Sequence, residues 1–463
     1  MQLGFWLTWG VSKTSSVDGW AGRSEETPMR SRESLGAGRE TSQRLDMVIA
    51  GGRVIDPASN RDGLFDVGIS GDRIVAVRPH LTPDRTTTVV EAEGSIVCPG
   101  LIDLHTHVYE HATDLGVPAD DVGVHAGVTT VVDQGSTGAW MFPGLRAQVI
   151  DRAATEVKAF LLVLLIGSCQ GDRGGPSVFN IQYCDPDAVV RMHARFPDMI
   201  RGVKSYGESG GFSSWHFDLL QLARRAADES NLPLYVHTGE VLVVDEQNRP
   251  RPEQIMPAIL DYVKPGDLLA HCYSDLPDGL LGEAEKPSQE LIDKVHSGVH
   301  LDVGHGINFS FDTARRMLDT GLLPYTISSD VHGTLGNAYH DDTALSYSLV
   351  GAMSKLLGLG MTLHDVLTAT TVSPATVLRM EDEIGTLDEG TRADITVLDV
   401  RRDDWRFYDG RRNTLDVGER LVPKLVIRAG RPIVPSGRLL RDVLSPDERG
   451  EAGLSVAIGG EPR

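Results

Sequence analysis

The stretch PGLIDLHTH, which begins at Pro99, ends in two histidines, His105 and His107, that are separated by one residue. Because side chains alternate between the two faces of a strand, both imidazoles would lie on the same face. Imidazole is a common ligand of Zn²⁺ and of other first-row divalent ions. The HxH spacing alone allows a metal site, but two histidines that happen to alternate would give the same pattern.

Four more polar residues stand where later apolar runs give way to polar sequence. They are Lys204 in IRGVKSYG, His237 in PLYVHTGE, His271 in DLLAHCYSD and Asp330 in LLPYTISSDVHG. The carboxyl ends of parallel strands meet at one mouth of a barrel, so we expect these residues and the HxH pair to form one cluster. Taken singly, Lys204 is typical of a solvated surface lysine and Asp330 of a helix N-cap.

Eight short apolar runs alternate with helix-like patterns through the centre of the chain. The helical spacing is clear in FDLLQLARRAADESN, where Leu219, Leu222, Ala223 and Ala226 recur at intervals of three and four. Repeated strand–helix units of this number predict an α/β fold, a (β/α)8 TIM barrel. An open doubly wound sheet is the alternative, but no Gly-rich dinucleotide motif follows the first strand.

The two ends of the folded sequence consist of short β-branched runs separated by Gly, Asp and Pro, which is typical of antiparallel strands and tight turns. We expect residues 46–98 and 381–435 to form the two parts of one small β-sandwich domain around a barrel at 99–380. Residues 1–45 consist of the start MQLGFWLTWG and a polar stretch, and are expected to be a disordered extension or an upstream start, with Met47 opening the folded part. Residues 436–463 are expected to form a C-terminal tail.

Composition limits the partners and the location of the protein. The 463 residues include 65 acidic and 44 basic ones, and the net charge of −21 argues against nucleic acid and anionic membranes as partners. The longest apolar run, AFLLVLLIG, is too short to span a bilayer. Four scattered cysteines without a CxxC pair favour reduced thiols and a cytoplasmic location. We expect a small-molecule substrate, and a homo-oligomer is compatible with the sequence.

Several motifs together resemble the amidohydrolase superfamily, and within it the amidohydrolase/deacetylase metallohydrolases related to dihydroorotase and hydantoinase. The resemblance covers about residues 47–435 and is carried by PGLIDLHTH, GVTTVVD, GVKSYG, VHTGE, AHC, GHG and TISSDVH. It implies a TIM barrel flanked by a β-sandwich. It also implies metal-dependent hydrolysis of carbon–nitrogen bonds other than peptide bonds.

The resemblance also implies a set of ligands for two divalent metal ions. One ion would be held by His105, His107, Asp330 and a carboxylated Lys204, and the second by the same Lys204 with His237 and His271. An ammonium group cannot bind a cation, whereas CO₂ would convert Lys204 into an anionic carbamate that can bridge two ions. Zn²⁺ is the expected metal, although Mn²⁺ or iron would fit the same ligands.

The reaction favoured by this resemblance is removal of an acyl or acetyl group from a small N-acyl compound, with an O-acyl ester fitting the same mechanism. A hydroxide that bridges the metals would attack the carbonyl, with Asp330 as the general base. One alternative is a cyclic amide hydrolase of the dihydroorotase or hydantoinase type. Another is an aminohydrolase that uses Glu240 in HTGE, and a third is a catalytically silent homologue that serves as a partner subunit.

Substrate-binding residues are the least specified part of the prediction. Tyr109, Glu240, His305 and His332 lie close to the ends of predicted strands and are candidates for contacts with the substrate. A substrate carboxylate would need an arginine at the mouth, and Arg173 is a candidate. The loops that follow the strands match no pattern that identifies the substrate.

Overall fold

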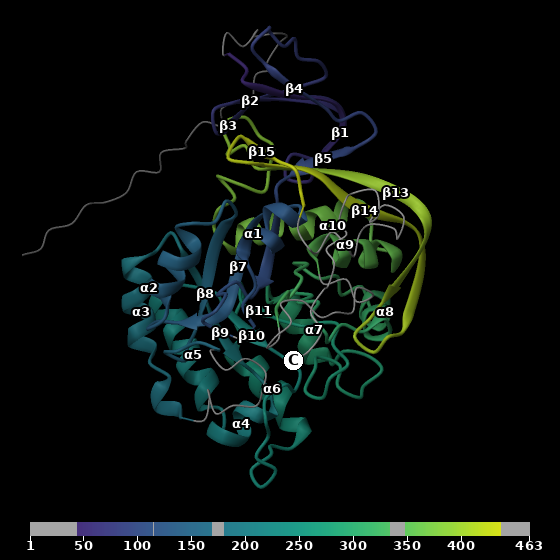
Figure 1. Cartoon of the computed structure of the whole chain (residues 1–463). Helices are drawn as coiled ribbons and strands as arrows, with labels where there is room; N and C mark the ends of the chain where they lie inside the picture. Colours follow the sequence, from purple (N-terminus) through teal and green to yellow (C-terminus); the bar gives the residue numbers. More distant parts are fainter. Residues whose placement is uncertain (1–43, 114, 169–179, 334–347, 437–463) are drawn as a thin grey trace, which may run out of the picture. The chain divides into compact units, whose positions relative to one another are not determined.

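The structure is a computed structural model, and it describes residues 44–113, 115–168, 180–333 and 348–436 (Figure 1). Every described residue belongs to one compact unit within Gln43–Arg463. Most of the predicted N-terminal extension and C-terminal tail lies outside the described residues, as do Arg173 and Cys169. Cys98, Cys184 and Cys272 are buried and free of disulfides.

A seven-stranded sheet of consecutive parallel strands forms the centre of the molecule. Its strands are β6 (Leu101–Thr106), β7 (Val128–Gly138), β8 (Glu156–Leu162), β9 (Ile200–Tyr206), β10 (Leu234–His237), β11 (Leu268–Leu269) and β12 (His300–Leu301). Nearly all their residues are buried, which agrees with the continuous apolar runs expected of a parallel sheet covered on both faces.

Residues 326–331, in the eighth apolar run, lie between the two edge strands of this sheet. Thr326 forms a parallel bridge with Asp302, directly after β12, and Val331 forms one with Thr106 of β6. The backbone N–H of Asp330 also donates to the carbonyl oxygen of His105 over 2.8 Å. The segment therefore brings Asp330 next to the first strand of the sheet.

Helices follow the strands, as the alternating pattern predicts. They are α1 (Ala119–Val122), α2 (Phe142–Leu145), α3 (Pro186–Arg195), α4 (Ser209–Trp215), α5 (Asp218–Ser230), α6 (Pro252–Tyr262), α7 (Gln289–His296), α8 (Phe311–Asp319), α9 (Leu349–Gly358), α10 (Leu363–Thr370) and α11 (Val372–Val377). Helix α5 buries Leu219, Leu220, Ala223, Ala226 and Ala227, and the predicted Leu222 packs against the same core but is only partly buried. Among the described helices, none is long and apolar enough to cross a membrane.

Both flanks of the chain contribute to a second, mixed sheet. Its strands are β1 (Met47–Asp56), β2 (Arg61–Ser70), β3 (Arg73–Arg78), β4 (Thr88–Glu91), β5 (Ile96–Pro99), β13 (Ile395–Tyr408), β14 (Thr414–Arg428) and β15 (Arg431–Ile433). Strand β13 pairs antiparallel with β5, so the C-terminal flank lies beside the N-terminal one. Strand pairing joins all eight strands into one mixed sheet.

Asp56, at the end of β1, connects the two flanks through a buried carboxylate. Its Oδ2 accepts hydrogen bonds from Ser59 Oγ, Thr386 Oγ1 and the backbone N–H of Leu387, at 2.7, 3.1 and 3.0 Å. Arg61 lies 3.5 Å from the same oxygen. The flanks are therefore held together by side-chain contacts as well as by strand pairing.

We expect Asp56→Ala to lower the free energy of unfolding by about 3 kcal/mol, because it leaves several buried donors without an acceptor. The urea concentration at the midpoint of unfolding measures the effect. Asp62→Ala is the matched control, since Asp62 is exposed and pairs with Arg53 at 2.8 Å. An exposed pair contributes less than about 1 kcal/mol, so equal losses in the two variants would contradict the proposed role of Asp56.

Candidate metal centre

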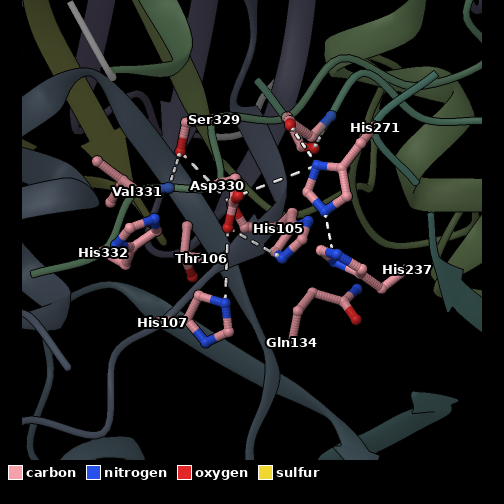
Figure 2. A network of polar contacts seen from close by, with 12 residues as sticks. His105, Thr106, His107, Gln134, His237, His271, Ser329, Asp330, Val331 and His332 are labelled. Carbon is pink, nitrogen blue, oxygen red and sulfur yellow. Dashed lines mark hydrogen bonds and ion pairs between the residues drawn. The ribbon is translucent and has the colours of Figure 1, made fainter. Parts of the chain in front are cut away.

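Two histidines at the end of β6 meet the carboxylate of Asp330. Nε2 of His105 lies 3.1 Å from Asp330 Oδ1, and Nε2 of His107 lies 3.6 Å from the same oxygen. The three residues are buried, and one ligand atom from each lies within 4.8 Å of the others, close enough for a single metal ion. Figure 2 shows both imidazoles turned toward the carboxylate. The side of His107 that faces away is anchored by Ser136, whose hydroxyl lies 2.9 Å from Nδ1.

Asp330 and His271 both adopt backbone conformations that are uncommon for residues with side chains. Their φ angles are +50° and +58°, in the left-handed region. Such conformations cost of order 1–3 kcal/mol and persist where the surrounding structure imposes them, which is common at functional sites. Here they direct two polar side chains toward the same point, with Nδ1 of His271 4.0 Å from Asp330 Oδ2.

His237 and His271 face each other across a distance of 2.8 Å between Nδ1 of His237 and Nε2 of His271. The other ring nitrogen of each lies near a backbone carbonyl, Gly239 O for His237 and Gly304 O for His271, at 3.0 and 2.7 Å. Burial lowers the pKa of His237 well below its usual value and that of His271 to about 4, so both rings are neutral at pH 7.

The proton count between these two histidines fits a cation. Two neutral imidazoles carry two N–H groups for three close contacts, two with carbonyl oxygens, which can only accept, and one between the rings. If both N–H groups donate to the carbonyls, two lone pairs face one another across the gap between the rings. Two nitrogens bound to one tetrahedral zinc ion at about 2.0–2.1 Å would be about 3.3 Å apart, so a small shift would accommodate an ion.

A buried hydrogen-bond chain orients His105. Its Nδ1 lies 2.9 Å from the hydroxyl of Tyr235, which lies 2.5 Å from Asp302 Oδ2. Burial raises the pKa of Tyr235 well above its usual value, so the hydroxyl keeps its proton and donates it to Asp302. Its oxygen can then accept the Nδ1–H of His105, which leaves the lone pair of Nε2 facing Asp330. Hydrogen bonds to the outer nitrogen are the usual way to orient metal-binding histidines.

Lys204 on β9 is buried in the same region. Its Nζ has no hydrogen-bond partner among the described residues and lies 4.3 Å from the ring centroid of Tyr235. Burial lowers the pKa of Lys204 to about 7, although the carboxylates of Asp330 and Asp302 oppose the shift. A buried amine without an acceptor is costly, and it is uncharged in about half of the molecules at pH 7.

These observations fit a divalent metal centre. Burial lowers the pKa of His105 well below its usual value, so its ring is neutral. For Asp330, burial acts to raise the pKa, but the adjoining histidines outweigh it and hold the pKa well below the usual range. Neutral imidazoles and an ionised carboxylate are the forms that bind metal.

The six predicted ligands line one cavity of about 80 Å³. The other described residues that line it are Leu115, Gln134, Tyr206, Val241, Leu242, Ile307, Asn308 and His332. Among these, apolar side chains form much of the wall, and they lie on loops that follow the strands. The structure thus brings together all six residues that the sequence placed at strand ends.

Gln134 on β7 is a polar residue of the cavity that the sequence analysis missed. Its Nε2 donates to the carbonyl oxygen of Leu104 over 2.7 Å, which orients the side-chain amide. Its Oε1 is buried and has no hydrogen-bond partner among the described residues. A buried acceptor without a donor costs about 1–3 kcal/mol, so a ligand that brings an N–H or O–H to this point would be stabilised. Gln134 directly follows the run GVTTVVD, and its place where an apolar run gives way to polar sequence could have identified it.

Glu208, just after β9, supports one wall of the cavity. Burial raises its pKa to about 8, and its Oε2 accepts the backbone N–H groups of Val241 and Leu242 at 3.0 and 3.4 Å. Because Val241 and Leu242 line the cavity, Glu208 helps to set the position of that wall. Nothing in the local sequence singles out this glutamate.

The four candidates for substrate contacts lie in different places. His332 lines the cavity, with its ring centroid 6.1 Å from that of His107. The carboxylate of Glu240 is paired with Arg249 at 2.5 Å, and Glu240 is not among the described residues that line the cavity.

His305 and Tyr109 are also absent from the described lining of the cavity. The ring of His305 stacks on Phe309, and its Nε2 lies 3.0 Å from Nζ of the buried Lys355 on α9. Tyr109 is buried, and its hydroxyl lies 3.4 Å from the carbonyl oxygen of Met141. Each lies near the end of β6 or β12, but its side chain contacts neighbouring packing elements.

Comparisons with known proteins agree with this geometry. The model of the amidohydrolase family matches residues 298–434. Deacetylase Atu3266 of Agrobacterium fabrum is 33% identical over 72% of this chain and 78% of its own length. A deacetylase of Brucella anthropi is 29% identical over 81% of this chain and 89% of its own length.

A solved structure shares the architecture as well. The crystal structure of a dihydroorotase superposes with a TM-score of 0.73 at 28% identity, and the match covers 84% of this chain and 98% of that one. The sequence relatives, the family match and the shared fold are mutually consistent. The chain belongs to the amidohydrolase family.

Proposed function

We propose that this protein is a metal-dependent hydrolase that removes an acyl group, most simply acetyl, from the nitrogen of a small molecule. The observation that carries the proposal is the convergence of His105, His107, His237, His271 and Asp330 on the cavity that also contains the amine of Lys204. The similarity to proteins named deacetylase supports the choice of reaction.

We further propose that the parallel sheet closes into a (β/α)8 barrel over residues 99–380. The parallel bridges of residues 326–331 with Asp302 and with Thr106 support closure. The mixed sheet formed by residues 46–98 and 381–435 would be the accompanying β-sandwich domain. This layout explains why residues far apart in the sequence share one cavity, because the carboxyl ends of barrel strands converge.

The ligands can hold two divalent ions, with Zn²⁺ as the expected metal. One ion would lie between His105, His107 and Asp330, the other between His237 and His271, and Lys204 in its carboxylated form would serve both. A bound divalent ion would supply Lewis acidity, which polarises a carbonyl and makes water a stronger acid. Carboxylation requires the neutral amine, and burial already lowers the pKa of Lys204 to about 7.

The residues of the chain would bind the substrate and move the proton. Asp330 is ionised and points into the cavity, so it would accept a proton from the attacking water and deliver it to the leaving nitrogen. The free Oε1 of Gln134 would accept the N–H of the scissile amide. An ester has no such hydrogen, so Gln134 favours an amide over an ester.

The other reactions remain alternatives with less support. A deaminase that used Glu240 would need this carboxylate in the cavity, whereas Glu240 is paired with Arg249. Hydrolysis of a cyclic amide would use the same ligands, and the similarity to a dihydroorotase structure fits it. We place it second because the sequence relatives with the highest coverage and identity given above are named deacetylases.

Turnover on a panel of substrates tests the proposed reaction. The panel contains N-acetyl amines and amino acids, their O-acetyl counterparts, cyclic ureides and aminated heterocycles, each with zinc-loaded protein. We expect acetate to be released from N-acetyl compounds. Ammonia as the sole product, or ring opening without acyl release, would contradict the proposal.

The same panel tests Gln134. In Gln134→Met, we expect kcat/KM to fall by about 10–100-fold for an N-acetyl compound and by less than about threefold for its O-acetyl counterpart, because only the amide offers an N–H. Equal losses for both substrates would show that Gln134 acts only through packing.

Carboxylation of Lys204 predicts a dependence on pH. An amine with a pKa of about 7 is about 90% neutral at pH 8 and about 10% neutral at pH 6. At equal dissolved CO₂, we therefore expect carbamate to form about tenfold more slowly at pH 6 than at pH 8 in metal-free protein. The ¹³C signal of labelled carbamate measures the rate, and Lys204→Met should lack it. Binding of two metal ions without any carbamate signal would contradict this role.

Asp330→Asn tests the general base. An amide cannot accept the proton, so we expect kcat to fall by about 10²–10⁴-fold. Metal content, measured by mass spectrometry after loading with excess zinc, shows whether the loss comes from the proton transfer or from a missing ion. Full turnover with metal bound would exclude Asp330 as the base.

A further inference from the structure

Strands β13 and β14 form a hairpin that extends well beyond the other strands of the mixed sheet (Figure 1). Only residues Ile395–Leu398 of β13 pair with β5, whereas β13 and β14 pair with each other as far as Tyr408 and Thr414. A two-stranded ribbon is at best marginally stable alone in water. Here β14 packs along α9, where Gly358 leaves room for Val417 and Leu415.

The tip of this ribbon, residues 408–414, contacts the loop that follows β12. The backbone N–H of Gly410 donates to the carbonyl oxygen of Phe309 over 2.8 Å. Asp409 Oδ2 accepts the backbone N–H of Phe311 at 3.1 Å. On the other side, Arg411 forms an ion pair with Asp275 at 3.0 Å. The tip therefore joins the loop after β12 to the loop after β11.

Asp409 is fully buried, and its hydrogen bonds hold the tip in shape. Its Oδ1 accepts the backbone N–H groups of Arg411 and Asn413, at 2.9 and 2.8 Å. Its Oδ2 is shared between the side chain of Asn413 and the N–H of Phe311. One carboxylate thus forms the turn and attaches it to the loop at the same time.

The loop held by the tip forms part of the cavity wall. Ile307 and Asn308 both line the cavity, and Ile307 is 39% exposed, so it presents apolar surface at the mouth. Gly410 lies against the backbone of Ile307, because a Cβ at position 410 would come within 1.8 Å of the carbonyl oxygen of Ile307. The position of the wall is therefore coupled to that of the ribbon.

We infer that the β13–β14 ribbon is a positioning element of the active site: its tip, through Asp409 and Gly410, sets the place of Ile307 and Asn308 and so shapes the substrate cavity. The C-terminal flank then acts on substrate selection from outside the parallel sheet. The contacts on which this depends do not require the proposed function. Only its effect on KM rests on that function.

Gly410→Ala tests the inference, with Gly418→Ala as the matched control. Both glycines lie on the ribbon, but a Cβ at position 418 would have open space around it. In Gly410→Ala, we expect backbone amides of residues 305–311 to exchange at least tenfold faster, and KM for the best N-acetyl substrate to rise about tenfold. Metal content should stay unchanged, and Gly418→Ala should match the wild type in every measurement.

Asp409→Asn is the second variant. If Gly410→Ala fails to fold, Asp409→Asn tests whether the tip positions the loop after β12. One amide oxygen can still accept from Arg411 and Asn413, while the NH₂ group cannot accept from Phe311. We expect the same faster exchange over residues 305–311 and the same rise in KM. Unchanged exchange and KM in the folded variants would overturn the inference. If no N-acyl compound is hydrolysed, exchange still decides whether the ribbon holds the loop, and the proposed function alone fails.

Discussion

The placement of protons among the buried imidazoles is the constraint on which the centre depends. His237 and His271 can each give an N–H to a backbone carbonyl, and His105 can give its Nδ1–H to Tyr235. With the protons placed in this way, the remaining lone pairs face the interior of the cavity, where Asp330 adds a negative charge. Such a concentration of lone pairs is unfavourable unless a cation balances it. The burial that makes the arrangement costly also keeps the rings neutral and able to bind metal.

The surrounding fold supplies what this arrangement requires. Parallel strands bring the ligands to one end, and left-handed backbone conformations at His271 and Asp330 turn two side chains inward. Behind the ligands, Tyr235 and Asp302 orient the ring of His105, and Ser136 contacts the ring of His107. These strained conformations persist because the surrounding packed core imposes them, as is usual for functional sites.

The mixed sheet is more than a separate stable unit, because the ribbon formed by two of its strands also contacts a loop that lines the cavity. Asp56 joins its two sequence-distant parts, and β13 and β14 continue from it to the loop after β12. The cavity wall is thereby tied to both sheets. Substrate selection in this chain thus depends on packing between the C-terminal flank and a loop of the central sheet, in addition to the residues at strand ends.

The sequence alone determined the parts of this protein that depend on local pattern. Apolar runs and their polar ends predicted the parallel strands, the helix α5 and the six candidate ligands, because strand ends of a parallel sheet converge whatever the loops do. Tertiary structure decided where the other polar side chains point. Glu240 pairs with Arg249 instead of lining the cavity. His305 lies against Lys355 and Gln134 is held by the carbonyl oxygen of Leu104, and both contacts join segments at least 30 residues apart. The ribbon shows the same limit: its strands could be read from the sequence, but the loop that it holds lies about a hundred residues away and is brought to it only by folding.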